Sequence, residues 1–123
     1  MKNNEFDLTI GERVALTSLL GQHAKGFNFF LYREAWKLID QIEISNEQEK
    51  KMIGFKEMPN GGFTWEDKTY TTRVEISDKM IETIGLIIQL MHDKEGFVLG
   101  LGRGYISLVD KLGLKIKESK KNG

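Results

Sequence analysis

The stretch ISDKMIETIGLIIQLMHDKEG, residues 76–96, predicts one long amphipathic helix on which the other elements pack. At about 100° per residue, one arc of this helix is continuously apolar and comprises Met80, Ile81, Ile84, Ile87, Ile88 and Met91. Ser77 or Asp78 can cap the start, because either side-chain oxygen can accept a hydrogen bond from a free first-turn N–H. Gly96 stands where a glycine commonly ends a helix. We expect the six apolar side chains to face the core.

The same helix carries a second, smaller apolar patch on its far side, formed by Leu86 and Leu90. A helix that is apolar on two sides usually contacts two neighbours, within the chain or across an oligomer interface. Gly85 lies inside the helix, where glycine costs roughly 1 kcal/mol relative to alanine, so a neighbouring helix of the same chain is expected to approach it closely. Leu86 and Leu90 are therefore candidate interface residues, together with Phe30, an isolated aromatic residue on the polar side of an earlier helix.

Composition bounds the class of protein. A chain of 123 residues with 40% hydrophobic residues suits one domain with a proper core. Its 18 basic and 18 acidic residues cancel, so there is no overall charge to attract nucleic acid or an anionic membrane. The absence of cysteine excludes disulfides and cysteine-based zinc sites. No run approaches the ~18 apolar residues of a membrane span, and the N-terminus lacks a signal peptide's apolar segment. We expect a cytoplasmic protein.

The remaining sequence predicts three further helices, one short helical turn and several short strands. Capping patterns start helices at about Ile10, after Asn28 and after Ser45, and Tyr105–Leu112 shares an apolar face. Segments 55–58 and 62–66 flank an Asn-Gly turn, and residues 70–76 alternate as a half-buried strand should. These patterns predict a single α+β domain, with about four helices on a two- or three-stranded antiparallel meander. Its ordered core should span about 8–113, with 1–7 and 115–123 as mobile tails.

The second helix has an apolar arc covering about half its circumference. Trp36 lies on that arc and is expected in the core. An alternative is a stacking platform for nucleic-acid bases, made of Trp36, Trp65, Tyr32, Phe63 and Tyr70.

The glycine-rich stretch 97–104 is the one segment that suggests phosphate binding. Glycines let backbone N–H groups approach an anion, and a helix N-terminus favours negative charge. The candidate contacts are Gly100, Gly102, Arg103, Gly104 and Tyr105. A dinucleotide fingerprint needs a strand before the loop, whereas here a long helix precedes it. A structural turn is therefore the preferred interpretation, and nucleotide or nucleic-acid binding is the alternative.

No catalytic or metal-binding constellation is apparent. His23 and His92 lack a carboxylate at a suitable spacing on the same element. No serine sits in a nucleophile elbow, and the carboxylates fall on polar helix faces. We therefore predict a protein that is not an enzyme and needs no cofactor or metal.

Four segments carry a resemblance: LTIGERVALTSLLGQ (8–22), GGFTWE (61–66), VEISDKMIETI (74–84) and YISLVDKL (105–112). In these the chain resembles a group of short proteins encoded by bacteriophages and prophages, and the match spans most of residues 7–112. It departs from them at Gly21, where a proline is usual, and in its glycine-rich segment 100–104. The resemblance implies a small helical domain with a β-hairpin and a viral accessory setting in a bacterial host. We expect a non-enzymatic binder of a host or phage macromolecule that also self-associates.

Overall fold

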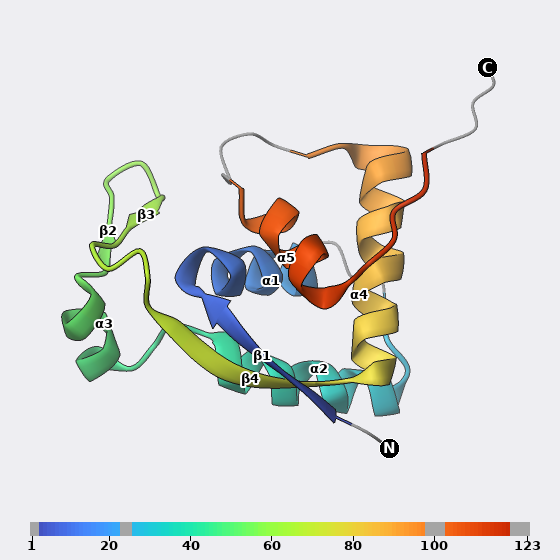
Figure 1. The fold of residues 1–123 in the computed structure, drawn as a ribbon, viewed down its shortest axis with the longest axis horizontal. Coiled ribbons are helices and arrows are strands. Elements are labelled where there is room, and N and C mark those ends of the chain that lie inside the picture. The colour runs from blue at the N-terminus through green and yellow to red at the C-terminus, as the bar shows by residue number, and fades with distance from the viewer. Residues whose placement is uncertain (1–2, 23–25, 98–102, 119–123) are drawn as a thin grey trace.

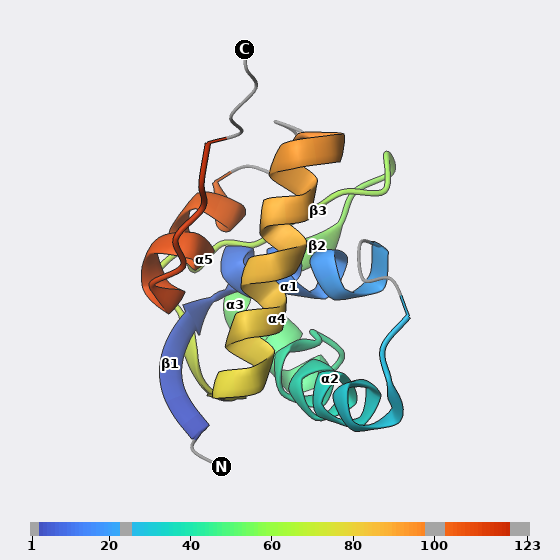
Figure 2. The same ribbon diagram turned by 90° about the vertical axis from the view of Figure 1, so that its right-hand side faces the viewer.

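The computed structural model describes residues 3–22, 26–97 and 103–118, which form five α-helices and two separate two-stranded antiparallel sheets (Figure 1). This arrangement confirms the predicted α+β class. Helix α4 stands beside a layer of α1 and α5, and α2 lies along the edge of β4 that is not paired with β1, in the two-stranded sheet formed by β1 and β4 (Figures 1 and 2). Short α3 and the β2–β3 hairpin project from one end of the molecule.

The central helix forms as predicted. Helix α4 spans Asp78–Leu90 and continues into a π-helical turn, η1, at Met91–Glu95. The Ser77 hydroxyl caps it by accepting a hydrogen bond from the Met80 N–H at 3.2 Å. Five of the six predicted core side chains are buried, and Ile81 is partly buried against the same core. Gly96 follows η1 with a φ of 78°, so a glycine ends the helix as expected.

Strand β4, Thr71–Ser77, pairs with the N-terminal strand β1, Asn3–Thr9. The prediction of a mobile tail at residues 1–7 is therefore wrong for its described part. Phe6 lies opposite Val74 in the register and is partly buried against the core, while neighbouring Leu8 is fully buried. Glu5 and Asp7 alternate with these residues and face outward, and their charges make the segment resemble a polar tail in composition.

The hairpin is separate from that sheet. Of the predicted two- or three-stranded meander, the two-stranded hairpin is therefore confirmed, and the addition of residues 70–76 as its third strand is wrong. Strands β2, Lys56–Glu57, and β3, Phe63–Thr64, pair only with each other among the described residues. Gly61 supplies the positive φ of the turn, at 90°. The N-terminal strand occupies one edge of β4, so the sheet joins two segments that lie more than sixty residues apart in the sequence.

Helix α1, Ile10–Gln22, lies between α5, Gly104–Leu112, on one side and α2, Phe29–Ile42, on the other. It therefore buries two faces, as its scattered apolar residues predict. One core joins these helices to the β1–β4 sheet and α4, and its fully buried members include Leu8, Leu16, Leu19, Ile42, Val74, Ile84 and Leu108.

Capping explains where the other helices begin and end. The Asn28 side chain accepts a hydrogen bond from the Leu31 N–H at 2.9 Å, as predicted. Helix α3, Glu47–Ile53, is capped by Asn46 and not by Ser45, one residue later than expected. Gly54 ends it in the left-handed conformation that glycine adopts without steric cost.

The segment after α5 lies along α4. A Cβ atom added at Gly85 would lie 3.4 Å from the Leu114 side chain, so the close approach predicted there comes from this segment and not from a helix. The Gln89 side-chain amide accepts from the Lys117 N–H and donates to the Lys117 carbonyl, at 2.8 and 2.9 Å. Residues 115–118 are therefore held by α4, contrary to the predicted tail, and 119–123 lie outside the described residues.

Candidate functional site

The predicted anion site is only partly visible. Gly100 and Gly102 lie outside the described residues. The other three predicted contacts lie at the start of α5 in different environments, because Arg103 is exposed, Gly104 is half-buried and Tyr105 is buried. Of the three described candidate contacts, Arg103 is therefore the one whose side chain faces solvent.

Packing accounts for two of these three residues. A Cβ atom at Gly104 would lie 2.7 Å from the Gly11 carbonyl oxygen and 3.0 Å from the Ala15 Cβ, so a side chain there would push α5 away from α1. The Tyr105 ring packs edge-to-face on Phe97, with ring centroids 5.6 Å apart. Burial raises the pKa of the Tyr105 phenol, which keeps it neutral. Gly104 allows the close contact of α5 with α1, and Tyr105 packs in the core, which favours the structural interpretation of this stretch.

Glu12 is a buried carboxylate whose oxygens are fully engaged. It accepts hydrogen bonds from the Thr9 N–H, the Ser107 hydroxyl and the Lys111 ammonium, each at 2.8 Å. The Glu12 N–H in turn donates to the Thr9 hydroxyl, which completes the predicted capping box. Burial alone would raise the pKa of Glu12, but these hydrogen bonds and the Lys111 charge outweigh it and lower the pKa. This carboxylate ties α1 to α5 and is not positioned as a proton donor.

A second buried charge, Arg13, joins α1 to the α2–α3 connection and to β4. Its guanidinium donates to both carboxylate oxygens of Glu49, the backbone carbonyls of Ile42 and Glu43, and the Thr72 hydroxyl. The Tyr70 hydroxyl donates to the same Glu49 carboxylate at 2.7 Å. The hydrogen bond from Arg13 lowers the pKa of Glu49 against the opposing effect of burial, and the Tyr70 hydrogen bond adds to it. With its donors occupied, Arg13 is structural.

These two carboxylates predict the acid sensitivity of the fold. Glu12 and Glu49 have pKa values below the ordinary 4.5 in the folded chain, so the unfolded chain binds protons first as pH falls. Their stabilisation is present above about pH 4.5 and is lost below it, at no more than about 1.4 kcal/mol per pH unit for each group. Urea unfolding between about pH 7 and 3 should show the free energy of unfolding declining at the acid end.

Glu49→Gln is the control for that measurement. This variant should be less stable than the native chain at pH 7, and its stability should fall less steeply in acid because one of the two titrating groups is gone. An equal slope in both proteins would show that Glu49 does not contribute to the acid sensitivity.

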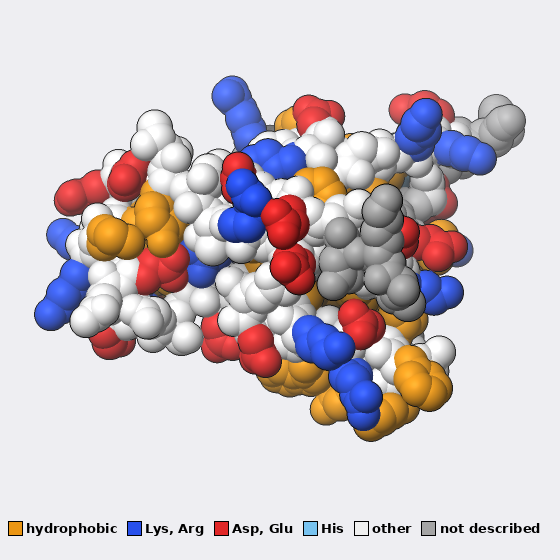
Figure 3. All heavy atoms as spheres, turned by 60° about the horizontal axis from the view of Figure 1, so that its bottom comes forward, with side chains coloured by type: hydrophobic (Ala, Val, Ile, Leu, Met, Phe, Trp, Pro, Cys, Tyr) orange, Lys and Arg blue, Asp and Glu red, His pale blue; other side chains and the backbone are white. Residues whose placement is uncertain are grey.

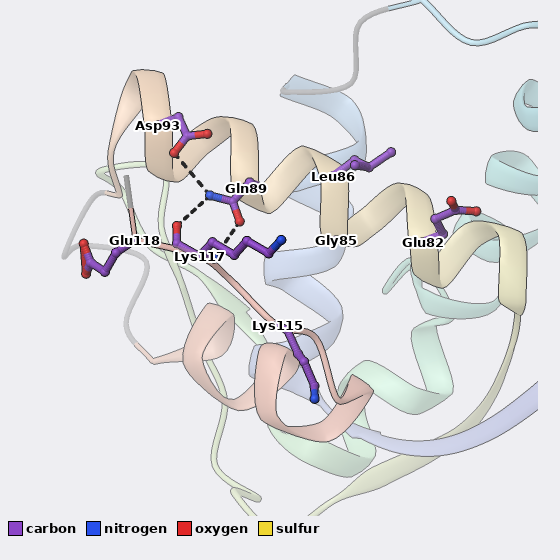
Figure 4. Close-up of a pocket in the computed structure, with 8 residues that line it drawn as sticks. All are labelled: Glu82, Gly85, Leu86, Gln89, Asp93, Lys115, Lys117 and Glu118. Carbon is purple, nitrogen blue, oxygen red and sulfur yellow. Dashed lines mark hydrogen bonds between the residues drawn. The ribbon is translucent and has the colours of Figure 1, made fainter. Parts of the chain in front are cut away.

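A groove of about 560 Å³ runs between α4 and the segment after α5 (Figure 4). Its lining is Glu82, Gly85, Leu86, Gln89, Asp93, Lys115, Lys117 and Glu118. The Gln89 amide reaches across to the Lys117 backbone, whereas Leu86 points away from that segment. Acidic and basic side chains are interspersed, so the groove presents no single sign of charge to a ligand.

The described residues contain no group of three or more His, Cys, Asp or Glu side chains that could hold a metal ion. His92 lies half-buried in η1, and His23 lies outside the described residues. Within the same part of the chain, none of the helices is long and apolar enough to cross a membrane.

The largest group of exposed aromatic side chains lies on the outer side of α2. We call Phe29, Phe30, Tyr32 and Trp36 the α2 aromatic face. Their exposed fractions run from 48% for Trp36 to 76% for Phe30. Hydrophobic side chains gather along the lower edge of the molecule in Figure 3, where α2 lies, with basic side chains between them. The Arg33 guanidinium lies over the Phe29 ring, 5.1 Å from its centroid. Large apolar areas left exposed in this way mark interaction sites.

No family model, curated protein or solved structure matches the chain. A functional conclusion therefore rests on the chemistry of its own residues.

The prediction that Trp36 lies in the core is wrong, because it is about half exposed. The buried positions of α2 are Ala35, Leu38 and Ile42, which occupy one half of its apolar arc. Tyr32 and Trp36 occupy the other half and face solvent. A core needs an apolar stripe little more than 100° wide, so an arc covering half the circumference already indicates a second surface. That width is the signal by which sequence reasoning could have found this site.

The other predicted contact residues do not join this surface. Phe30 belongs to the α2 aromatic face, but Leu86 is an exposed residue of α4 beside the groove and Leu90 is half-buried. The stacking platform is also not assembled, since Trp65 lies beside Gly11 with Lys68 over its ring, 4.2 Å from the centroid.

Proposed function

We propose that this chain is a non-enzymatic binding protein that attaches to a protein partner through the α2 aromatic face. The observation that carries the proposal is the exposure of four large aromatic side chains within eight residues of one helix, with Arg33 stacked among them. Aromatic residues and arginine are the types most enriched at interface centres and binding hot spots. The opposite side of α2 is anchored in the core, so the face is held on a rigid element.

The charges around the face favour protein over nucleic acid. Arg33 and Lys37 are accompanied by Glu34 and Asp40 on the same helix, and Lys37 is paired with Glu34 at 3.3 Å. Nucleic-acid interfaces are strongly positive, because lysine and arginine neutralise the phosphate charges, whereas this surface carries both signs equally. The alternative is nucleotide binding at residues 100–104. In the described part of that segment, Arg103 is the exposed cation that could pair with a phosphate.

The setting we propose is that of a phage-type accessory protein in the cytoplasm of a bacterial host, acting on a host, defence or phage protein. This part of the proposal rests on the resemblance of segments 8–22, 61–66, 74–84 and 105–112 to phage- and prophage-encoded proteins.

Site-specific photocrosslinking tests the proposed surface. The photoreactive amino acid p-benzoylphenylalanine is placed at Phe30 or, as a control, at Ile106 of α5, which is also an exposed apolar residue. Irradiation of cells that make the protein should yield a discrete protein adduct from position 30 and little from position 106. Adding Trp36→Ser should reduce the adduct from position 30 severalfold, because it removes the central aromatic residue of the face.

Three outcomes would contradict the proposal: no adduct from position 30, equal adducts from both positions, or an adduct that contains nucleic acid and no protein. Trp36 is about half exposed, so its replacement should leave the fold intact, and thermal unfolding of the purified variant verifies this.

A further inference from the structure

We infer that the partner at the α2 aromatic face is a second copy of this chain, with the two α2 helices packed antiparallel. This inference rests on the proposed function, since it names the occupant of the same surface. It follows from the order of side chains along the outermost ridge of α2.

The ridge is formed by Phe29, Arg33, Trp36 and Asp40. Their spacing of i, i+4, i+7 and i+11 places them within about 60° of one another on the helix. Ala35, Leu38 and Ile42, the buried residues, lie on the opposite side. A ridge of this spacing is the pattern by which one helix packs against another. At 14 residues, α2 is about 21 Å long, enough for three to four turns of contact.

The charges along the ridge of one copy are complementary to those of a second, antiparallel copy. Arg33 and Asp40 lie at equal distances on either side of the point between Trp36 and Lys37. A twofold axis through that point places Arg33 of each copy opposite Asp40 of the other, and brings the two Trp36 side chains together near the centre. Neither Arg33 nor Asp40 forms an ion pair within the described residues, so both charges are available. If the two helices packed in parallel, each Arg33 would instead face the other Arg33, and each Asp40 the other Asp40.

The area of the face is suited to a modest dimer. The three aromatic side chains on or beside the ridge, Phe29, Tyr32 and Trp36, together expose roughly 330 Å², taking about 200 Å² for a fully exposed aromatic side chain, while Phe30 lies at the margin of the contact. A standard interface covers about 800 Å² on each partner, and the rest of the ridge adds to the aromatic contribution. We therefore expect a weak dimer, which forms only at high micromolar concentrations.

Charge reversal with complementation tests this arrangement. Sedimentation of the native chain up to several hundred micromolar should show a concentration-dependent change from monomer to dimer. Arg33→Asp and Asp40→Arg should each weaken dimerisation roughly tenfold, because each places two like-charged pairs across the interface. An equimolar mixture of the two variants should form a heterodimer at least as tight as the native dimer, since both pairs are then attractive again. Native mass spectrometry distinguishes the heterodimer by mass.

Two matched variants serve as controls. Lys51→Glu reverses an exposed charge on α3, and Leu86→Asp adds a charge at the other predicted interface. Both should leave the dissociation constant unchanged. All four substituted positions are exposed, so the variants should fold.

The inference is overturned if the native chain stays monomeric, if dimerisation is indifferent to Arg33→Asp and Asp40→Arg, or if their mixture fails to restore it. A monomer that still crosslinks from position 30 to a different protein would overturn the homodimer and leave the proposed function standing. If Leu86→Asp weakened the dimer and Arg33→Asp did not, the dimer interface would lie on α4 and not on α2.

Discussion

Replacing Arg13 with methionine should lower the free energy of unfolding by about 3–5 kcal/mol. The Arg13 side chain is 3% exposed and donates to both oxygens of the Glu49 carboxylate, as well as to two backbone carbonyls. Methionine fills much of the same volume, so the loss comes mainly from leaving a largely buried carboxylate and two carbonyls without their donor. Urea or guanidinium unfolding at pH 7 measures it.

Arg73→Met is the matched control. The Arg73 side chain bridges Glu5 and Asp7 with equally short contacts of 2.7 and 2.8 Å, but it is 62% exposed. Water replaces the lost partner at such a site, so this variant should cost less than about 1 kcal/mol. If both variants lost similar stability, burial would not be the cause of the effect at Arg13.

The double variant Arg13→Met/Glu49→Leu separates the two contributions to that loss. It removes the unpaired carboxylate, so it should recover part of the stability that Arg13→Met alone has lost. A double variant as unstable as the sum of both single ones would mean that packing around the guanidinium, and not its charge, holds α1 to the α2–α3 connection.

Sequence reasoning predicted the elements whose signals are local. The apolar arc of 76–96 and the caps at Thr9, Asn28 and Ser77 depend on residues within a few positions of one another, and each is confirmed. Ion pairs between residues far apart in the sequence cannot be predicted from such local patterns. Arg13 and Glu49 lie on separate helices, and each resembles an ordinary residue of a solvated helix face until the fold brings them together.

The pairing of β1 with β4 could not be predicted for a related reason. Asn3–Thr9 contains two apolar residues at alternate positions, Phe6 and Leu8, too few to distinguish a strand from a polar tail. Its partner lies more than sixty residues away, so the register depends on which edge of β4 remains free after the helices pack. On the opposite edge, the Gln41 amide exchanges hydrogen bonds with the Glu75 backbone, which leaves one edge for β1.

The candidate site was half predicted. Phe30 is predicted as a contact residue because it stands alone among polar neighbours, whereas Trp36 lies on an apolar arc, which predicts that it is in the core. Periodicity tells which residues share a side of a helix but not how much of that side its neighbours can cover. On α2, the buried side chains are those of Ala35, Leu38 and Ile42, which pack in the core. The bulkier aromatic side chains beside them stay exposed to solvent.

Replacing Ile84 with alanine should lower the free energy of unfolding by about 2–5 kcal/mol, while Leu86→Ala should change it by no more than about 0.5 kcal/mol. The two residues are two positions apart on α4 and nearly equal in volume, and they differ in burial, because Ile84 is fully buried and Leu86 is 65% exposed. Helix propensity favours alanine at both positions, so it cannot produce a loss at one of them only. Denaturant unfolding at pH 7 measures both variants, and equal losses would mean that α4 does not present the arc of Met80, Ile84 and Ile88 to the core.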